Sequence, residues 1–220
     1  QMISEGVDII DIGGESTRPG ADRVSEEEEI ARTIPVIKEL AKHDVKISID
    51  TMRASTAKAA IDAGASIIND VSGGLADPLM LQTAAALKVP YIAMHWRGQS
   101  KDMNSKAIYG DVVSDVISEL QERVDAALDA GITAENLIID PGLGFAKDAD
   151  HNWAIIDAID QFVALGYPVL VGASRKRFLG GDTPDEREQA TIDLTKRLAP
   201  TGVWAVRVHS VKPHKEVLAV

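Results

Sequence analysis

Pro168-Val-Leu-Val-Gly-Ala-Ser-Arg-Lys-Arg-Phe178 joins a short apolar run to a polar and strongly basic one. The apolar part lies between Tyr167 and Ala173 and predicts a strand buried on both faces, as in parallel sheets. A hydroxyl and three cations, Ser174 to Arg177, follow it directly. Open α/β sheets and (β/α)8 barrels place ligands at the carboxyl ends of their strands, so we expect an anionic or carbonyl-rich ligand there. A basic surface loop that only contacts water is the alternative.

The chain on either side of this stretch alternates strands with helices. Strands are predicted at residues 7–12, 46–50, 66–70, 91–95, 137–140, 168–172 and 203–209. Helices are predicted from a Ser25/Glu28 capping box onward and at residues 54–63, 78–87, 112–130, 152–165 and 184–198, with another beginning near the end. Because the alternation is strict and the composition does not change, residues 1–220 are expected to form a single α/β domain.

Seven strands are one fewer than a closed (β/α)8 barrel needs. Residues 1–5 followed by Gly6 have the pattern of the last turn of a helix with its C-terminal glycine. The predicted fold is therefore a (β/α)8 TIM barrel, with its first strand expected upstream of Gln1. A doubly wound open sheet is the structural alternative, although no Gly-x-Gly-x-x-Gly opens a helix and no Walker loop is present.

Composition excludes several classes of protein. The 220 residues include no cysteine, which removes disulfides, thiolate nucleophiles and Cys-based zinc sites. A net charge of -11 argues against nucleic acid or an anionic membrane as the main partner. No apolar run has the length of a membrane span and nothing at the start has the pattern of a signal peptide, so a cytoplasmic location is expected.

Polar residues lie at or just beyond the ends of four predicted strands. In a barrel these ends converge on one mouth, where two carboxylates, one amide and one ammonium would suit a flat heterocycle with donors on one edge and acceptors on the other. Asp50 could instead cap the next helix, and Asn69-Asp70 could form an Asx turn. The four residues are Asp50, Asn69, Asp140 and Lys176.

Two further segments are candidates for the same mouth. The turn Asp140-Pro-Gly-Leu-Gly-Phe145 has two glycines that allow close approach of the backbone to a ligand, and Phe145 can line the pocket. Arg207 and His209 share one face of the last strand and can clamp a phosphate. The alternative is an arginine paired with a barrel carboxylate and a histidine bonded to backbone.

Three other groups of residues have less specific patterns. Thr17, Arg18 and Pro19 form a loop that offers a cation and a hydroxyl, or a simple surface turn. Residues 96–110 make a long polar connection and a candidate lid. His95 and His209 could hold zinc in a metal hydrolase, although no His-x-His pair accompanies them. Met94 is expected to be a pocket wall, and the remaining histidines are interpreted as surface positions: His43, His151 and His214.

Ordered motifs over nearly the whole chain resemble the bacterial dihydropteroate synthases. The Trp96 loop and residues 174–180 resemble actinobacterial members in particular. The motifs are Asp11-Ile-Gly-Gly-Glu-Ser-Thr-Arg-Pro-Gly20, Ser48-Ile-Asp-Thr51, Ile68-Asn-Asp-Val-Ser-Gly73, Met94-His95, Asp140-Pro-Gly-Leu-Gly-Phe145, Ser174-Arg-Lys176 and Arg207-Val-His209.

The resemblance implies a barrel enzyme that joins 6-hydroxymethyl-7,8-dihydropterin diphosphate to 4-aminobenzoate and releases pyrophosphate in folate biosynthesis. It implies Mg²⁺ as cofactor, a homodimer, and sulfonamides as competitors of aminobenzoate. By motif position, Asp50, Asn69, Met94, Asp140, Phe145 and Lys176 would bind pterin; Arg207 and His209 pyrophosphate; and Thr17, Arg18, Pro19 and Ser174 aminobenzoate. The catalytic set would be Asp50, Lys176, Arg207 and His209, with no metal ligand in this chain.

Three departures from the family pattern matter. The N-terminal strand and flexible loop, with the Asn that helps to bind magnesium, are absent from the given sequence. Arg177 stands where many members have Ser beside the aminobenzoate carboxylate, and Ser210 replaces the Asp that usually follows Arg-x-His. Two other functions remain open: a non-catalytic pterin-binding paralogue, and a corrinoid-dependent pterin methyltransferase. The methyltransferase handles no pyrophosphate, so the two basic motifs around Lys176 and Arg207 count against it.

Overall fold

The computed structural model of the protein describes residues 1–16, 22–99 and 103–219. Its strands are all parallel to their neighbours and follow chain order, with a single bridge between Ile139 and Val169 linking the two hydrogen-bonded groups. The strands are β1 (Ile9–Gly13), β2 (Lys46–Asp50), β3 (Ile67–Asp70), β4 (Tyr91–Met94), β5 (Leu137–Asp140), β6 (Leu170–Val171) and β7 (Ala205–Val206).

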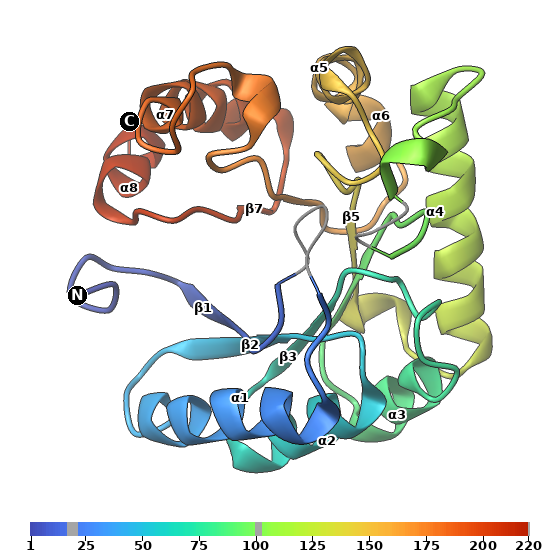
Figure 1. Cartoon of the computed structure of the whole chain (residues 1–220), viewed down its shortest axis with the longest axis vertical. Helices are drawn as coiled ribbons and strands as arrows, with labels where there is room; N and C mark the ends of the chain where they lie inside the picture. The colour runs from blue at the N-terminus through green and yellow to red at the C-terminus, as the bar shows by residue number, and fades with distance from the viewer. Residues whose placement is uncertain (17–21, 100–102, 220) are drawn as a thin grey trace.

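Helices lie around the outside of these strands (Figure 1). Sequential parallel strands with helices outside are the arrangement of a (β/α)8 barrel, so the predicted fold class is confirmed. The α-helices are α1 (Glu26–Leu40), α2 (Ala54–Ala63), α3 (Met80–Leu87), α4 (Val112–Asp129), α5 (Ala149–Asp157), α6 (Ile159–Val163), α7 (Arg187–Leu198) and α8 (Lys212–Leu218). Short 3-10 turns are η1 (Met103–Lys106), η2 (Ala134–Asn136), η3 (Arg177–Leu179) and η4 (Ala199–Thr201).

Local chemistry sets the ends of several helices. The Ser25 hydroxyl accepts a hydrogen bond from the N–H of Glu28 and so begins α1. Gly64, with φ +117°, ends α2 in the left-handed conformation that glycine adopts most readily. Asp148 and the side chain of His151 form a reciprocal capping box at the start of α5. Among the described residues, no helix combines the length and the apolar character that a membrane crossing requires.

Two predicted elements are shorter or divided in the structure. The run at residues 203–209 pairs as a strand only at Ala205–Val206, since β6 is its sole hydrogen-bonded neighbour among the described strands and has just two residues. The helix predicted at 152–165 is divided at Ala158, whose φ of -108° and ψ of 22° interrupt the helical ladder. Residues 1–6 form turns that end at Gly6 with φ +83°.

The core has two layers, one on each face of the strands. Ile67, Ile92, Ile138 and Leu170 come from four different strands and pack together as a cluster separate from the main one. This one-residue-per-strand pattern is that of a filled barrel interior. The larger cluster packs the other faces of the strands against the helices and includes the fully buried Leu120 of α4.

Leu120→Ala is expected to lower the free energy of unfolding by about 2–5 kcal/mol, because it removes buried methyl groups and leaves a cavity. Leu128 lies on the same helix and is 37% exposed, so Leu128→Ala is the matched control and should cost about 1 kcal/mol or less. Urea denaturation followed by circular dichroism measures both. Equal losses in the two variants would contradict this account of the core.

Candidate active site

Arg207, just beyond β7, lies between two carboxylates, one from the middle of β1 and one from the carboxyl end of β2. Its Nε is 2.7 Å from Asp11 Oδ2 and its Nη2 is 3.1 Å from Asp50 Oδ2. Asn69 of β3 donates to the Asp11 carboxylate at 3.3 Å, and the Ser48 hydroxyl donates to the same group. These contacts bring four strand ends to one mouth. The sequence analysis did not select Asp11, although its alternation with Ile10 and Ile12 in an apolar strand was the available signal.

Asp140 and Lys176 face the same rim of this mouth. The buried Asp140 carboxylate accepts the N–H of Gly142 at 2.7 Å, and the Lys176 ammonium donates to the carbonyl of Leu143. Gly172 lies beside Asp140 and Arg207. A Cβ added to this glycine would be 3.8 Å from Asp140 Oδ2 and 4.0 Å from Arg207 Cβ. The carboxylate of Asp140 and the base of the Arg207 side chain therefore both lie next to Gly172, while the guanidinium itself contacts Asp11 and Asp50.

An apolar wall completes the mouth. Met94 at the end of β4 clusters with Met52 and Val71, and Phe145 packs against this group. The Lys176 Nζ lies 4.7 Å from the centre of the Phe145 ring, a distance at which a cation interacts with the ring face. Met94 and Phe145 were predicted as pocket walls, whereas Met52 and Val71 were not considered. A flat ring system can pack on such a surface while its polar edges meet the carboxylates.

His209 contacts Ser174 at one side of the mouth. Its Nδ1 is 2.9 Å from the Ser174 hydroxyl, and its backbone N–H donates to the same oxygen at 3.3 Å. Ser210 donates to Glu188 of α7, which also accepts from Arg175 Nε at 2.7 Å. Arg175 is therefore held toward α7. A hollow of about 410 Å³ lies next to His209, lined also by Arg175 and Lys212.

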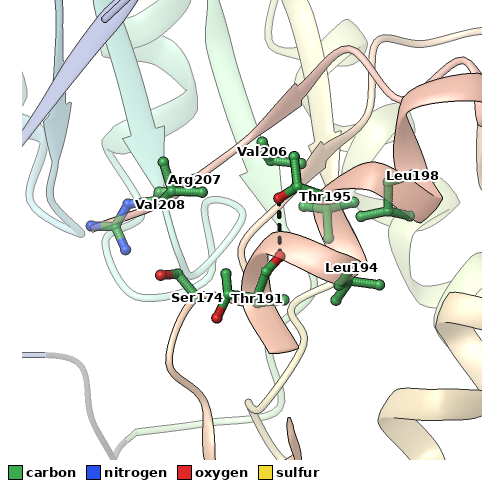
Figure 2. Close-up of a pocket in the computed structure, with 10 residues that line it drawn as sticks. Ser174, Thr191, Leu194, Thr195, Leu198, Val206, Arg207 and Val208 are labelled. Atoms are coloured by element: carbon green, nitrogen blue, oxygen red, sulfur yellow. Dashed lines mark hydrogen bonds between the residues drawn. The ribbon is translucent and has the colours of Figure 1, made fainter. Parts of the chain in front are cut away.

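A second, much smaller cavity of about 10 Å³ lies between β6, β7 and α7. Figure 2 shows Ser174 and Arg207 at its edge, with Thr191 and Thr195 of α7 joined by a hydrogen bond of 3.1 Å. Its volume is about that of one water-sized probe. It is a packing defect beneath the mouth and has no room for a substrate.

Burial shifts the ionisation of the groups at the mouth. Loss of hydration, reinforced by Asp11 and opposed by Arg207, raises the pKa of Asp50 to about 7. Burial also raises the pKa of Asp140, against the effect of Lys176. The pKa of Lys176 is lowered to about 8 by burial, with Asp140 acting in the opposite direction. Asp50 and Lys176 can therefore both change charge near neutral pH.

The structure decides between several alternatives left open above. Asp50 does not cap α2, whose N-cap is Arg53 without a side-chain bond. Asn69 turns to Asp11, and it is Asp70 that forms the Asx turn, accepting the N–H of Ser72 at 2.8 Å. The pairing of Arg207 with barrel carboxylates is also present, so in the ligand-free chain this arginine already has acidic partners.

The histidines do not form a zinc site in the described part of the chain. His95 contacts Glu119 and Lys147, His209 contacts Ser174, and no group of three or more potential ligands is found among the described residues. The interpretation of His214 as a surface residue is wrong. Helix α8 packs on α7, and this contact buries the imidazole against the Thr195 hydroxyl at 2.8 Å. His43 is exposed, and His151 is partly covered where it caps α5.

Thr17, Arg18 and Pro19 lie outside the described residues, but the segments that flank them are held together. Arg53, between β2 and α2, donates to the carbonyl of Val24 at 2.6 Å and contacts the carboxylates of Glu15 and Glu29. Glu15 also accepts from Arg23 at 2.9 Å. Both ends of the loop are thus fixed to the mouth side of the barrel by one arginine. Arg177 is exposed and lies on the turn η3.

A barrel mouth with clustered carboxylates, an amide, two cations and an apolar wall defines an enzyme that binds a flat, donor-rich heterocycle carrying an anionic group. The family model described as "Pterin binding enzyme" matches residues 1–209. The chain belongs to this family, and within it to the dihydropteroate synthases.

Individual relatives agree with this membership. The dihydropteroate synthase of Mycobacterium leprae is 48% identical over 229 aligned residues, which cover 100% of this chain and 81% of the relative. The Xanthomonas albilineans dihydropteroate synthase solved with 4-aminobenzoic acid has a TM-score of 0.93 at 40% identity, covering 99% of this chain and 79% of its own. The Yersinia pestis enzyme solved with a sulfonamide drug has a TM-score of 0.96 at 37% identity, with coverages of 99% and 80%.

Proposed function

We propose that this chain condenses 6-hydroxymethyl-7,8-dihydropterin diphosphate with 4-aminobenzoate to give 7,8-dihydropteroate and pyrophosphate. The observation that carries the proposal is that Asp140 and Arg207 both lie beside Gly172 at the mouth, with the Arg207 guanidinium extended toward Asp11 and Asp50. An acid and a cation at one mouth match a substrate that has a donor-rich ring at one end and an anion at the other. The relatives solved with 4-aminobenzoic acid or with 7,8-dihydropteroate support the same pair of ligands.

In this proposal the dihydropterin ring lies against the wall of Met94 and Phe145. Carboxylates accept the N–H groups of its amino-pyrimidine edge, and the ammonium of Lys176 donates to an acceptor on the ring. Burial supports these assignments, because a carboxylate or amide enclosed at the mouth is desolvated and gains from a matching partner. The pterin-binding set is Asp50, Asn69, Met94, Asp140, Phe145 and Lys176.

The reaction follows from where the charges lie. Departure of pyrophosphate leaves a methylene cation conjugated with the ring, and the carboxylate of Asp50 stabilises this positive charge. Arg207 and His209 hold the leaving anion, and His209 also borders the hollow that Arg175, Lys212 and Glu5 line. The amino nitrogen of 4-aminobenzoate attacks the methylene carbon, forms the new C–N bond and loses a proton. Ser174, Thr17, Arg18 and Pro19 border the aminobenzoate in this scheme.

We further propose Mg²⁺ as cofactor, a homodimer formed through helices away from the mouth, and a cytoplasmic location. The described residues do not themselves offer a cluster of three metal ligands. The ion would therefore arrive on the diphosphate oxygens, where it would neutralise charge. Light scattering tests the dimer, and calorimetric titration of Mg²⁺ with and without the diphosphate substrate tests the mode of metal binding.

The pH dependence of kcat/KM for the pterin substrate is expected to be bell-shaped. Below pH about 7 Asp50 takes up a proton and no longer stabilises the cationic methylene, so the rate falls. As the pH rises through about 7 and 8, two buried lysines of the site lose their charge, Lys147 with a pKa of about 7 and Lys176 with a pKa of about 8, so the rate falls again. Initial rates in buffers of constant ionic strength measure the profile. A flat profile from pH about 6 to 9 would contradict the roles of these groups.

Release of pyrophosphate decides the function. The protein is incubated with both substrates and Mg²⁺, and pyrophosphate is followed with a coupled enzymatic assay. Release that depends on 4-aminobenzoate is the expected result. Pterin binding without release would identify a non-catalytic paralogue, and transfer of a methyl group from a methylated pterin to a corrinoid would identify the methyltransferase instead.

A further inference from the structure

Lys147 is a buried lysine that the catalytic scheme does not use. It follows the pterin-facing turn 142–147, and its Nζ lies 2.8 Å from His95 Nδ1 and 3.1 Å from each of two carbonyl oxygens, those of Gly142 and Phe145. His95 Nε2 faces the Glu119 carboxylate, which can only accept, so a neutral imidazole leaves Nδ1 as an acceptor and the three contacts of Nζ need the three N–H donors of the ammonium form. These hydrogen bonds favour the charged form, whereas burial acts against it and lowers the pKa of Lys147 to about 7.

The turn that Lys147 holds has an unusual backbone. Gly142, Gly144 and Ala146 have φ values of +68°, +77° and +48°, so three of its residues are in left-handed conformations. A Cβ on Gly142 would be 2.5 Å from the carbonyl oxygen of His95, which shows how closely the turn packs against the end of β4. Such a backbone persists only where surrounding contacts hold it. The ammonium of Lys147 donates to two carbonyls within this segment, those of Gly142 and Phe145.

A polar chain leads from Lys147 to the connection after β4. Because the Glu119 carboxylate can only accept, the imidazole proton is on His95 Nε2, which donates to Glu119 Oε2 at 2.9 Å and leaves Nδ1 to accept from Lys147. Burial and the nearby Lys147 lower the pKa of His95 to about 4, so the ring is neutral. Hydrogen bonds from His95, and then from Arg97, outweigh desolvation and lower the pKa of Glu119 to about 2, so it is a carboxylate.

Arg97 extends the chain into the loop. It binds Glu119 through Nε at 3.0 Å and donates from Nη1 to the carbonyl of Ile108 at 2.5 Å. Its guanidinium carbon lies 3.8 Å from the centre of the Tyr109 ring, and the Tyr109 hydroxyl donates back to the carbonyl of Ala146 at 2.9 Å. The described part of the loop therefore contacts the turn by two routes, one through Tyr109 and one through Lys147.

We propose that Lys147 is a positioning residue for the pterin substrate, and that the chain Lys147, His95, Glu119 and Arg97 couples the connection after β4 to the turn 142–147. The proposal rests on the proposed function, because it assigns the turn to the pterin pocket. Lys147 does not touch the reacting atoms in this account. Its ammonium fixes the backbone that carries Phe145 and the N–H of Gly142, and that N–H holds the Asp140 carboxylate.

The main test compares Lys147→Met with wild type in steady-state kinetics. The variant is expected to raise KM for the dihydropterin diphosphate by about tenfold or more, the size of one or more lost hydrogen bonds to a charged group. The KM for 4-aminobenzoate should change by about twofold or less, because that substrate contacts other loops. Thr195→Val is the matched control: it also loses a buried hydrogen bond, at the α7–α8 contact, and should leave both KM values unchanged. An unchanged pterin KM, or equal rises for both substrates, would overturn the proposal.

Glu119→Gln tests the coupling at a side chain remote from the turn and provides a second variant should Lys147→Met fail to fold. Hydrogen exchange of the amides of residues 142–147, measured without substrate, should be faster in Glu119→Gln than in wild type and unchanged in Thr195→Val. The pterin KM of the double variant Glu119→Gln, Lys147→Met should match that of Lys147→Met alone. Unchanged exchange or simple additivity would overturn the coupling. Faster exchange in Glu119→Gln, found in a protein without synthase activity, would support the coupling and reject only the proposed function.

Discussion

Arg207→Ala is expected to lower kcat/KM for the dihydropterin diphosphate by about 10²–10³, the usual effect of removing a group that stabilises developing negative charge. In the free protein this guanidinium contacts Asp11 at 2.7 Å and Asp50 at 3.1 Å. Its loss removes the cation that receives the leaving pyrophosphate in the proposed function, and leaves the carboxylates of Asp11 and Asp50 without this partner. Binding of 6-hydroxymethyl-7,8-dihydropterin, which lacks the diphosphate, should change by about threefold or less.

Two further variants define what the arginine contributes. Arg207→Lys keeps the charge but loses the planar fork that reaches two carboxylates at once, so it should recover only part of the rate. Arg197 forms an exposed ion pair with Asp157 at 2.6 Å, and Arg197→Ala should leave kcat/KM unchanged. Circular dichroism establishes that each variant is folded before rates are compared. An Arg207→Ala enzyme with the kinetics of wild type would refute the pyrophosphate site.

Asp140→Asn is expected to weaken binding of the dihydropterin by about 10- to 100-fold, since a hydrogen bond to a charged group contributes about 1.5–3 kcal/mol. Asparagine keeps the size of the side chain and can still accept the N–H of Gly142. What it loses is the negative charge that faces Lys176 and that attracts the pterin N–H groups in the proposed function. Isothermal calorimetry with the dihydropterin measures the effect directly.

The pairing with Lys176 can be measured in the same way. Lys176→Met alone should also weaken pterin binding, and the double variant should be less impaired than the sum of the two single effects, because the residues share one ligand. Asp157→Asn, on the exposed surface, is the control and should bind pterin like wild type. Full additivity of Asp140→Asn and Lys176→Met would show that the two residues act on separate ligands.

The residues that meet at the mouth could be predicted largely from their positions at the ends of strands. Asp50, Asn69 and Asp140 each follow an apolar run, and parallel strands bring such positions to one edge regardless of their distance along the chain. Asp11 could also have been predicted. It is the polar residue of an otherwise apolar strand, so its side chain would be expected to point to a different face from those of Ile10 and Ile12. The sequence therefore predicted that these side chains share one mouth. It did not predict which of the carboxylates Arg207 contacts.

Other features depend on packing that no local pattern encodes. Lys147 follows a glycine-rich turn, where a lysine is normally expected on the surface. In the structure it comes directly after the left-handed residue Ala146, and its side chain points inward to His95. His214 lies in a polar segment, and only the contact between α8 and α7 buries it. Ala158 interrupts a helix whose apolar periodicity continues on both sides. In each case tertiary contacts outweigh the preference of the segment.

The shared guanidinium at the mouth also bears on how a catalytic cycle ends. Asp11 and Asp50 contact Arg207 through Nε and Nη2, so in the proposed function they compete with pyrophosphate for the same donors. When the bond to the methylene has broken, these carboxylates can recapture the arginine and favour escape of the by-product. Product inhibition by pyrophosphate should accordingly become stronger in Asp11→Asn, a variant in which one of the competing acids has been neutralised.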